Sequence, residues 1–288
     1  MQWINALIQG VLLGGLYALL ASGLSLMFGV MRIVNLAHGL LAVASAYLGL
    51  VFVEHGVHAA LAIPAVMIVA ALVGYALQRV LFDRSLSVGG LAPLLVAFGL
   101  AVVVTQLLQE IFTADTRTIQ IGSFATTSLR LGPDLAIGVF PLVTFAVGVT
   151  AIVGLQLFLA KTSLGRAMRA AGDDAEAVQL MGISRRHIYG LATAIALATV
   201  GLAGMFLGMR TQFSPTYGDS VLIFAFEAVI IGGMGSLWGT LAGGVMLGVA
   251  QTVGAEVASA DGVLIGHLVF LVVLAVKPSG LIPKTVTT

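Results

Sequence analysis

Long hydrophobic runs separated by short polar connections occupy most of the chain. A helix crosses the hydrocarbon core of a bilayer with roughly 20 apolar residues, and in lipid its backbone must form its hydrogen bonds internally. The pattern therefore predicts an all-α polytopic membrane protein, one transmembrane domain over residues 1–288 with about 8–10 transmembrane helices, some of them short or broken. Its nine apolar segments are 4–29, 36–53, 59–78, 91–111, 138–159, 188–208, 221–234, 237–255 and 262–276.

Glycine pairs four residues apart recur within these segments. In membrane helices this spacing lets two backbones approach closely. Because glycine is abundant, with 36 residues, we interpret the pairs as general packing within a helix bundle rather than as a dimerisation motif. The pairs are Gly10 and Gly14, Gly204 and Gly208, and Gly244 and Gly248.

The basic residues predict which loops face the cytoplasm. Five of the thirteen Lys and Arg residues lie in the loop 161–187, and cytoplasmic loops carry an excess of positive charge. If this loop is cytoplasmic, alternation of the spans places five more basic residues on the same side. We therefore expect an N-terminus outside and a cytoplasmic C-terminus. The five further residues are Arg32, Arg79, Arg84, Lys277 and Lys284.

Composition supports a membrane location and excludes several kinds of site. Apolar residues make up 59% of the chain and charged residues 9%, with a mean hydropathy of +1.11, which leaves too little polar surface for a water-soluble domain. The net charge of +1 gives no indication of a nucleic-acid partner, so membrane lipid is the expected surrounding. The chain has no cysteine, which excludes disulfides, thiolate nucleophiles and cysteine metal sites. The first apolar run lacks a preceding basic segment and is too long for a signal peptide, so we expect a retained span.

The loop at about 112–137 has a different pattern. Ile119 and Ile121 alternate with polar residues, as do Leu129 and Leu131, around a middle rich in Gly, Ser and Thr. Alternation with a period of two about a turn is typical of a β-hairpin. We expect a small extracytoplasmic hairpin that either caps the bundle or docks an external partner.

Capping residues divide the basic loop into short helices. Asp173 is placed to cap the second of them, with Glu176 three positions later completing a capping-box pattern, and Gly182 is placed to end it. The predicted caps and stops, in chain order, are Thr162 or Ser163, then Gly172, Asp173, Gly182 and Ser184.

Apolar residues in this loop recur every three or four positions and predict one apolar stripe. An amphipathic element in a cytoplasmic loop binds either the lipid surface or a groove on another protein. The small, flexible side chains and the acids Asp173, Asp174 and Glu176 favour a protein groove; the alternative is a connector whose arginines only enforce topology. The stripe consists of Leu164, Met168, Ala171, Ala175, Val178 and Met181.

The segment "EAVQLMG", in which Glu176 stands six residues before Gly182, resembles the EAA loop of ABC transporter permeases. Longer blocks resemble, in order, the permeases of branched-chain amino-acid ABC importers, and most of all the LivH-like member of the usual pair. These blocks are "GLYALLASGLSLMFGVMRIVNLAHG", "KTSLGRAMRAAGDDAEAVQLMGIS", "FSPTYGD", "AFEAVIIGGMGSLWGTLAGGVMLG" and "VLAVKPSGLIP".

The resemblance implies a non-enzymatic permease subunit in the bacterial inner membrane. It implies a path for branched-chain or related amino acids, a second, LivM-like permease, two LivG- and LivF-like ATPase subunits that bind ATP and Mg, and a periplasmic binding protein. The alternatives are a permease of this family for urea, short amides or other amino acids, and an ATP-independent secondary transporter. The residues implied for ATPase coupling are Leu164, Gly165, Arg166, Arg169, Asp173, Glu176, Ala177 and Gly182.

The residues themselves offer no catalytic set. Lys161 precedes a threonine, but Leu155 and Ala160 occupy the positions where a phosphate-binding loop needs glycine. The five histidines are scattered; His55 and His58, with a single nearby glutamate, indicate an ordinary solvated loop more than a metal site. We therefore expect no cofactor on this chain and ATP hydrolysis on partner subunits.

A few polar and glycine residues inside apolar segments are candidates for a translocation path. A carboxylate such as Glu227 inside a span faces water or a polar partner, so it either lines the path or anchors two helices. The glycines that follow it form either a tight turn, which is the simpler interpretation, or a broken helix at the path. Asn35 and His38 fit a helix cap better than a ligand. The candidates are Asn35, His38, Glu227, Gly232, Gly233 and Gly235.

Overall fold

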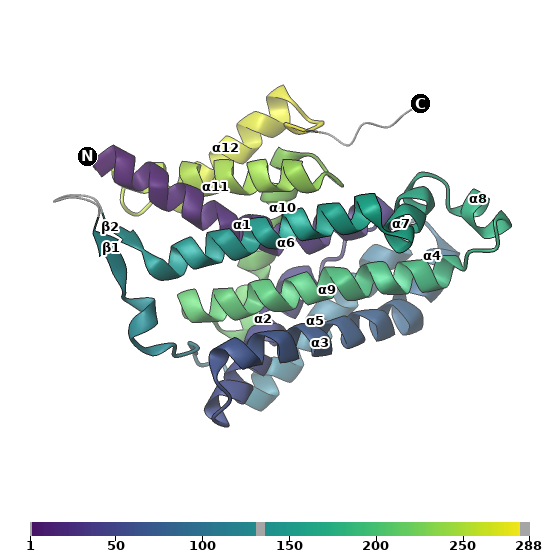
Figure 1. The fold of residues 1–288 in the computed structure, drawn as a ribbon, viewed down its shortest axis with the longest axis horizontal. Coiled ribbons are helices and arrows are strands. Elements are labelled where there is room, and N and C mark those ends of the chain that lie inside the picture. The colour runs from purple at the N-terminus through teal and green to yellow at the C-terminus, as the bar shows by residue number, and fades with distance from the viewer. Residues whose placement is uncertain (1, 131–135, 283–288) are drawn as a thin grey trace.

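The computed structural model describes residues 2–130 and 136–282, and helices dominate it (Figure 1). A π-helix, η1 (Gln78–Phe82), joins α3 to α4, and two short strands, β1 (Ser128–Arg130) and β2 (Ala136–Gly138), form the sheet. The α-helices are α1 (Gln2–Met31), α2 (His38–Glu54), α3 (Ala59–Leu77), α4 (Asp83–Val88), α5 (Ala92–Phe112), α6 (Val139–Lys161), α7 (Ser163–Asp173), α8 (Ala175–Leu180), α9 (Arg185–Arg210), α10 (Gly218–Gly232), α11 (Leu237–Val257) and α12 (Gly262–Val276).

Each of the nine predicted apolar segments is a helix, which confirms the all-α polytopic class. Within the described residues, seven helices are long and apolar enough to cross a bilayer, counting η1 and α4 with α3 and the 3-10 turn Pro215–Tyr217 with α10. The other two are shorter: α2 has 17 residues and α12 has 15. The ninth segment is thus a short helix, α12, whereas the seventh, α10, reaches 18 residues together with the turn before it.

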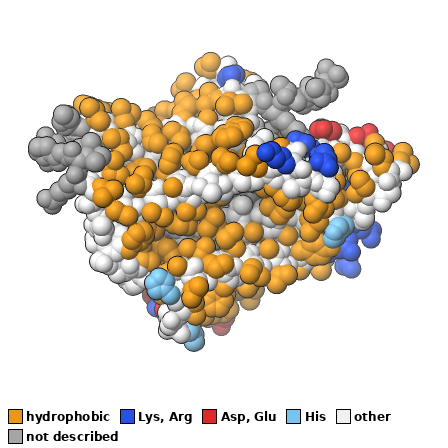
Figure 2. Space-filling model, viewed as in Figure 1, with side chains coloured by type: hydrophobic (Ala, Val, Ile, Leu, Met, Phe, Trp, Pro, Cys, Tyr) orange, Lys and Arg blue, Asp and Glu red, His pale blue; other side chains and the backbone are white. Residues whose placement is uncertain are grey.

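Helices α1 and α9 form the centre of the bundle and are mostly buried. Helix α1 packs against α11, α6, α9 and α10, while α9 packs against α3 and α2. Helices α3, α5 and α12 lie outside and expose large hydrophobic side chains. Figure 2 shows apolar side chains covering the flank of the molecule. Such a surface is stable against lipid but not against water.

Two of the glycine pairs meet each other across the contact between α1 and α11. A Cβ atom at Gly14 would lie 2.4 Å from the Cα of Val245, and one at Gly248 would lie 2.4 Å from the carbonyl oxygen of Gly10. Close backbone approach of this kind needs residues without a Cβ atom. The glycine pairs therefore serve packing inside this chain, as the sequence indicated.

The loops separate into two groups at opposite ends of the bundle. At one end, α7 contacts the end of α1, Gln78 bonds to Thr193 near the start of α9, and Leu281 after α12 bonds to Ile231 near the end of α10. This end, called the basic end below, carries nine of the ten basic residues grouped by the sequence; Lys284 lies outside the described residues. Figures 1 and 2 show α7, α8 and most of the visible Lys and Arg side chains toward it.

The hairpin at the opposite end differs from the prediction. Ser128 pairs with Gly138 and Arg130 with Ala136, so β1 has β2 as its partner; Leu131 lies outside the described residues. Ile119 is not in the hairpin: its amide donates to the carbonyl oxygen of Gly208, and its side chain is 1% exposed. Burying this side chain against α9 stabilises it more than a surface strand would.

Candidate functional site

Helix α7 begins where the sequence predicts and ends later. The hydroxyl oxygen of Thr162 accepts a hydrogen bond from the Gly165 amide at 2.9 Å and caps the helix. Gly172 does not end it, because the helix continues to Asp173. Instead Gly172 lies against α1, where an added Cβ would be 2.3 Å from the carbonyl oxygen of Gly29. This glycine allows a close helix contact rather than a helix stop.

Helix α8 is capped by Asp174, not by Asp173 as predicted. The Oδ1 atom of Asp174 accepts hydrogen bonds from the amides of Glu176 at 2.9 Å and Ala177 at 3.0 Å. The later end of α7 moves the cap by one residue. Glu176 therefore stands second in α8, one position short of a capping box, although its charge still favours the helix N-terminus.

Gly182 ends the loop's second helix as predicted. Its φ of +79° lies in the left-handed region, where glycine is favoured. The Gly182 amide donates to the carbonyl oxygen of Gln179, and the Ile183 amide donates to that of Val178. This pair of bonds is a Schellman motif. Ser184 follows as the N-cap residue of α9 without a side-chain cap bond.

The predicted apolar stripe is divided by the structure. Met168, Ala171 and Val178 are buried in a cluster with residues of α1, α6 and α9. Leu180 is 90% exposed and Met181 is 77% exposed. The expectation that the stripe is offered to a partner is therefore wrong for Met168, Ala171 and Val178, which seal α7 and α8 onto this chain's own core, whereas Met181 of the stripe stays exposed.

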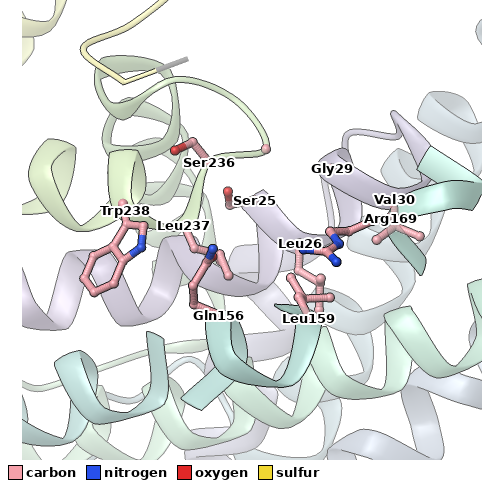
Figure 3. A pocket seen from close by; sticks show the side chains of 11 residues that line it. Ser25, Leu26, Gly29, Val30, Gln156, Leu159, Arg169, Ser236, Leu237 and Trp238 are labelled. Atoms are coloured by element: carbon pink, nitrogen blue, oxygen red, sulfur yellow. The ribbon is translucent and has the colours of Figure 1, made fainter. Parts of the chain in front are cut away.

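The remaining candidates for ATPase coupling lie in different surroundings. An added Cβ at Gly165 would lie 2.3 Å from the carbonyl oxygen of Phe158, so α7 lies tightly on α6. The Arg169 side chain extends into a cavity at the start of α11 (Figure 3). The exposed Arg166 donates from Nη1 to the Lys161 carbonyl oxygen. The exposed residues from Glu176 to Gly182, called the coupling tip below, are Glu176, Ala177, Gln179, Leu180, Met181 and Gly182.

Asn35 and His38 hold the connection between α1 and α2, and both are fully buried. The Asn35 side-chain oxygen accepts from the Ala37 amide at 3.0 Å, and its carbonyl oxygen accepts from the His38 amide. The Nε2 atom of His38 lies 2.8 Å from the carbonyl oxygen of Leu20 and therefore carries the proton. Ala37 is the N-cap residue of α2 and has no side-chain cap bond, so Asn35 forms the turn before the helix and is not the helix cap that the sequence favoured.

Glu227 is 4% exposed and pairs with a residue that the sequence did not connect to it. Its Oε1 atom lies 2.5 Å from Nδ1 of His267, a contact that ties α10 to α12. The Tyr17 hydroxyl donates to Gln251 Oε1 at 2.6 Å and ties α1 to α11. The Phe224 ring lies between the two pairs, 5.1 Å from the Tyr17 ring and 6.1 Å from the His267 ring.

The three candidate glycines lie in the α10–α11 turn at the basic end. Gly233 and Gly235 have φ values of +106° and +81°. A Cβ at Gly232 would lie 2.1 Å from the carbonyl oxygen of Gly239, and the Ile282 amide bonds to the Gly232 carbonyl oxygen. The structure thus has the tight turn, which was the simpler interpretation.

The family described as "Branched-chain amino acid transport system / permease component" matches residues 6–276. The chain belongs to this family.

Two curated permeases are similar to nearly the whole chain, and a third is similar to part of it. The permease BraD of the high-affinity branched-chain amino acid transport system of Pseudomonas aeruginosa is 29% identical, over 98% of this chain and 96% of the relative. The permease LivH of the corresponding system of Escherichia coli is 25% identical, over 99% and 96%. The permease LivM of that Escherichia coli system is 32% identical over 46% of this chain and 33% of the relative. The similarity to LivH and BraD, unlike that to LivM, spans both the loop and the path candidates.

As a member of this permease family, the chain is a transport component. The described residues contain no group of three or more His, Asp or Glu residues that could hold a metal ion. His55 Nδ1 lies 2.8 Å from the Val51 carbonyl oxygen, and His58 Nδ1 accepts from the Ala60 amide. Each of these histidines therefore has a ring nitrogen bonded to a backbone group four or two residues away.

Sequence reasoning missed Tyr17, Gln251 and His267 as partners of buried polar groups. A signal was present, because Gln251 and His267 each interrupt an apolar segment, and polar side chains at such positions bond across membrane helices. The partner of each cannot be read from the chain alone, since α10 and α12 are joined through an intervening helix and the bond spans 40 positions.

Proposed function

We propose that this permease is one of two permease subunits of an ABC importer for branched-chain amino acids in the bacterial inner membrane. The single permease domain carries no ATPase. A LivM-like permease completes the path, two LivG- and LivF-like ATPases with ATP and Mg drive it, and a periplasmic protein delivers the substrate. The full-length similarity to BraD and LivH supports this substrate class.

The observation that carries the ATPase partner is the coupling tip. Figure 1 shows α8 projecting beyond the bundle at the basic end. Leu180 and Met181 are exposed there outside the apolar flank of the molecule. Burying each in a cleft of a partner would contribute about 1.5–3 kcal/mol. Glu176 and Ala177 lie on the same short helix and complete the surface offered to that cleft.

The loop is built to transmit a displacement of the coupling tip. Val178 anchors α8 in the buried cluster that also holds Met168 and Ala171 of α7. Gly172 brings α7 into backbone contact with α1, and Gly165 brings it into contact with α6. Because these contacts are close-packed, a movement of α8 reaches the spans rather than being absorbed in the loop.

The basic end is placed in the cytoplasm, which puts the N-terminus outside and the C-terminus in the cytoplasm. The β1–β2 hairpin then lies outside, in position to receive a binding protein. Asn35, His38 and Glu227 border the path as residues that hold helices together, since each bonds to another helix or to its own turn. The Gly232–Gly239 contact lets α10 and α11 shift against each other, which alternating access requires.

The test uses the four subunits and the binding protein reconstituted in proteoliposomes. The double variant L180S/M181S should lose substrate-stimulated ATPase activity and co-purification of the ATPases. Val88→Ser, an exposed apolar site at the end of α4 and outside the coupling loop, is the matched control and should retain both. Full stimulation in the double variant would refute the assignment of the coupling tip.

The same reconstituted system also tests which substrate is transported and which energy source drives transport. Uptake of leucine that depends on ATP and the binding protein supports the importer. Uptake of urea or a short amide in its place would assign the chain to the alternative substrates. Uptake by the permease pair without the ATPases would indicate a secondary transporter.

A further inference from the structure

A cavity of about 360 Å³ lies at the basic end, between α1, α6, α7 and the start of α11 (Figure 3). Its volume falls within the roughly 300–1,000 Å³ typical of small-molecule sites. It is separate from the coupling tip and from the Glu227–His267 pair. Its lining residues are Ser25, Leu26, Gly29, Val30, Gln156, Leu159, Arg169, Gly235, Ser236, Leu237 and Trp238.

The start of α11 borders this cavity, and the first amides of a helix have no partner within the helix. Ser236 caps the helix, accepting from the Gly239 amide at 3.1 Å. The amides of Leu237 and Trp238, which line the cavity, precede the first intrahelical hydrogen bond. Helix α11 has 21 residues, long enough for its dipole to favour an anion at this end.

Ser25 adds a buried donor that has no partner. Its side chain is 1% exposed, and its Oγ atom forms no hydrogen bond with any described residue. Figure 3 shows this hydroxyl projecting from α1 toward Ser236. A buried hydroxyl normally finds a partner, because leaving it unpaired costs about 1–3 kcal/mol. Its position in the cavity points to a ligand that accepts hydrogen bonds.

Arg169 supplies positive charge to the same space. Its side chain lines the cavity from α7 (Figure 3). The ion pairs between described residues are Arg79–Asp83 and Glu227–His267, so Arg169 takes part in neither. Among the described residues that line the cavity, Arg169 is the sole ionisable one. Gln156 contributes a further amide donor.

We propose that this cavity binds a phosphate group, and that the group belongs to an anionic phospholipid of the leaflet at the basic end. Several hydrogen-bond donors line this one cavity, and its charged lining residue, Arg169, is positive. This combination suits a phosphate. Trp238 lines the cavity and is 46% exposed; exposed Trp residues are typical of the interface where headgroups lie. Basic pockets between helices on the cytoplasmic side bind such headgroups.

A bound phosphate would connect α7 to the start of α11 through Arg169 and the α11 amides. Helix α7 is part of the loop that carries the coupling tip, so the lipid would stabilise the position of that loop. The inference relies on the proposed cytoplasmic placement of the basic end only for the choice of leaflet. The binding site itself is tested on the isolated permease, without ATPases or substrate.

Native mass spectrometry of the purified permease in detergent, titrated with palmitoyl-oleoyl-phosphatidylglycerol, tests the site. Wild type should bind one molecule more tightly than it binds palmitoyl-oleoyl-phosphatidylcholine. Arg169→Gln should weaken that affinity about tenfold or more, as expected for one charge-assisted hydrogen bond. The matched control is Arg166→Gln, an exposed arginine on the same helix outside the cavity, which should bind as wild type does.

A second variant and a soluble anion provide two further tests of the phosphate site. Ser25→Ala keeps the charge and should still weaken phosphatidylglycerol binding severalfold, which covers the case that Arg169→Gln does not fold. A thermal shift with inorganic phosphate that depends on Arg169 would support the phosphate site and assign it to a free anion. Equal phosphatidylglycerol affinity in wild type, Arg169→Gln and Ser25→Ala would overturn the proposal. Loss of association with the second permease in Arg169→Gln, with lipid binding unchanged, would assign the cavity to a protein contact and overturn it as well.

Discussion

The contact between α7 and α1 at Gly172 allows a sharp prediction. An alanine Cβ there would lie 2.3 Å from the Gly29 carbonyl oxygen, whereas ordinary contacts begin at 3.4 Å. The obstacle is backbone, which no side-chain rotation removes, so α7 must move by roughly 1 Å in this close-packed region. We expect Gly172→Ala to move α7, and with it the coupling tip, away from α1.

The magnitude follows from two opposing effects. Overpacking of this kind costs about 1–3 kcal/mol, and the helix propensity of alanine over glycine offsets roughly 1 kcal/mol of it. A net loss of about 1 kcal/mol lowers the melting temperature by roughly 2–4 °C for a chain of this size. The melting temperature in detergent should therefore fall by a few degrees, and substrate-stimulated ATPase activity of the reconstituted transporter should fall with it.

Gly154→Ala is the matched control. Gly154 lies in α6, and an added Cβ there meets no atom within 4 Å. The same substitution should thus leave the melting temperature unchanged or raise it, with full stimulation of ATPase activity. If Gly172→Ala behaves like Gly154→Ala in both assays, the inference that α7 needs this backbone contact is wrong.

Three further predictions concern other parts of the molecule. His267→Leu should lower the melting temperature in detergent by an amount corresponding to about 3–5 kcal/mol, because Glu227 stays buried without its partner. His267→Gln keeps a hydrogen-bond donor and should lower the melting temperature far less; equal melting temperatures of the two variants would contradict the pairing. Gly182→Val should reduce ATPase stimulation because the left-handed backbone costs a side chain about 1–2 kcal/mol, whereas Gly182→Asn should be tolerated; an unaffected Val variant speaks against the α8 stop. In this naturally cysteine-free chain, Ala170→Cys should react with an impermeant thiol reagent only from the cytoplasm and Thr126→Cys only from outside, and the reverse pattern would refute the orientation.

The helix caps and stops show which features can be predicted from the local sequence and which cannot. Gly182 could be recognised as a helix stop because its left-handed φ is a property of its own backbone and of the neighbouring residues. Gly172 could not be recognised as a contact residue, because its role depends on Gly29, more than a hundred positions earlier in the chain. The Asp174 cap then differed from the predicted Asp173 because the end of α7 depends on that same contact.

The apolar stripe in the loop shows a second limit. Spacing of three or four residues correctly indicated one apolar face on short helices. Spacing does not say what covers that face, and here Met168 and Val178 are buried against this chain's own helices. The exposed pair Leu180 and Met181 is the part left for a partner, and exposure is decided by neighbours that are distant in sequence.

The sequence by itself determined the helical spans, the separation of charge between the two ends and the family, because bilayer thickness, backbone hydrogen bonding and loop charge act on local segments. The tertiary structure alone decided that Glu227 meets His267, that Tyr17 meets Gln251, and that Arg169 and Ser25 share a cavity with the start of α11. Each of these sites is assembled from different helices. Their meeting depends on how close the glycine surfaces let the backbones approach, which is a property of the packed bundle and not of any one segment.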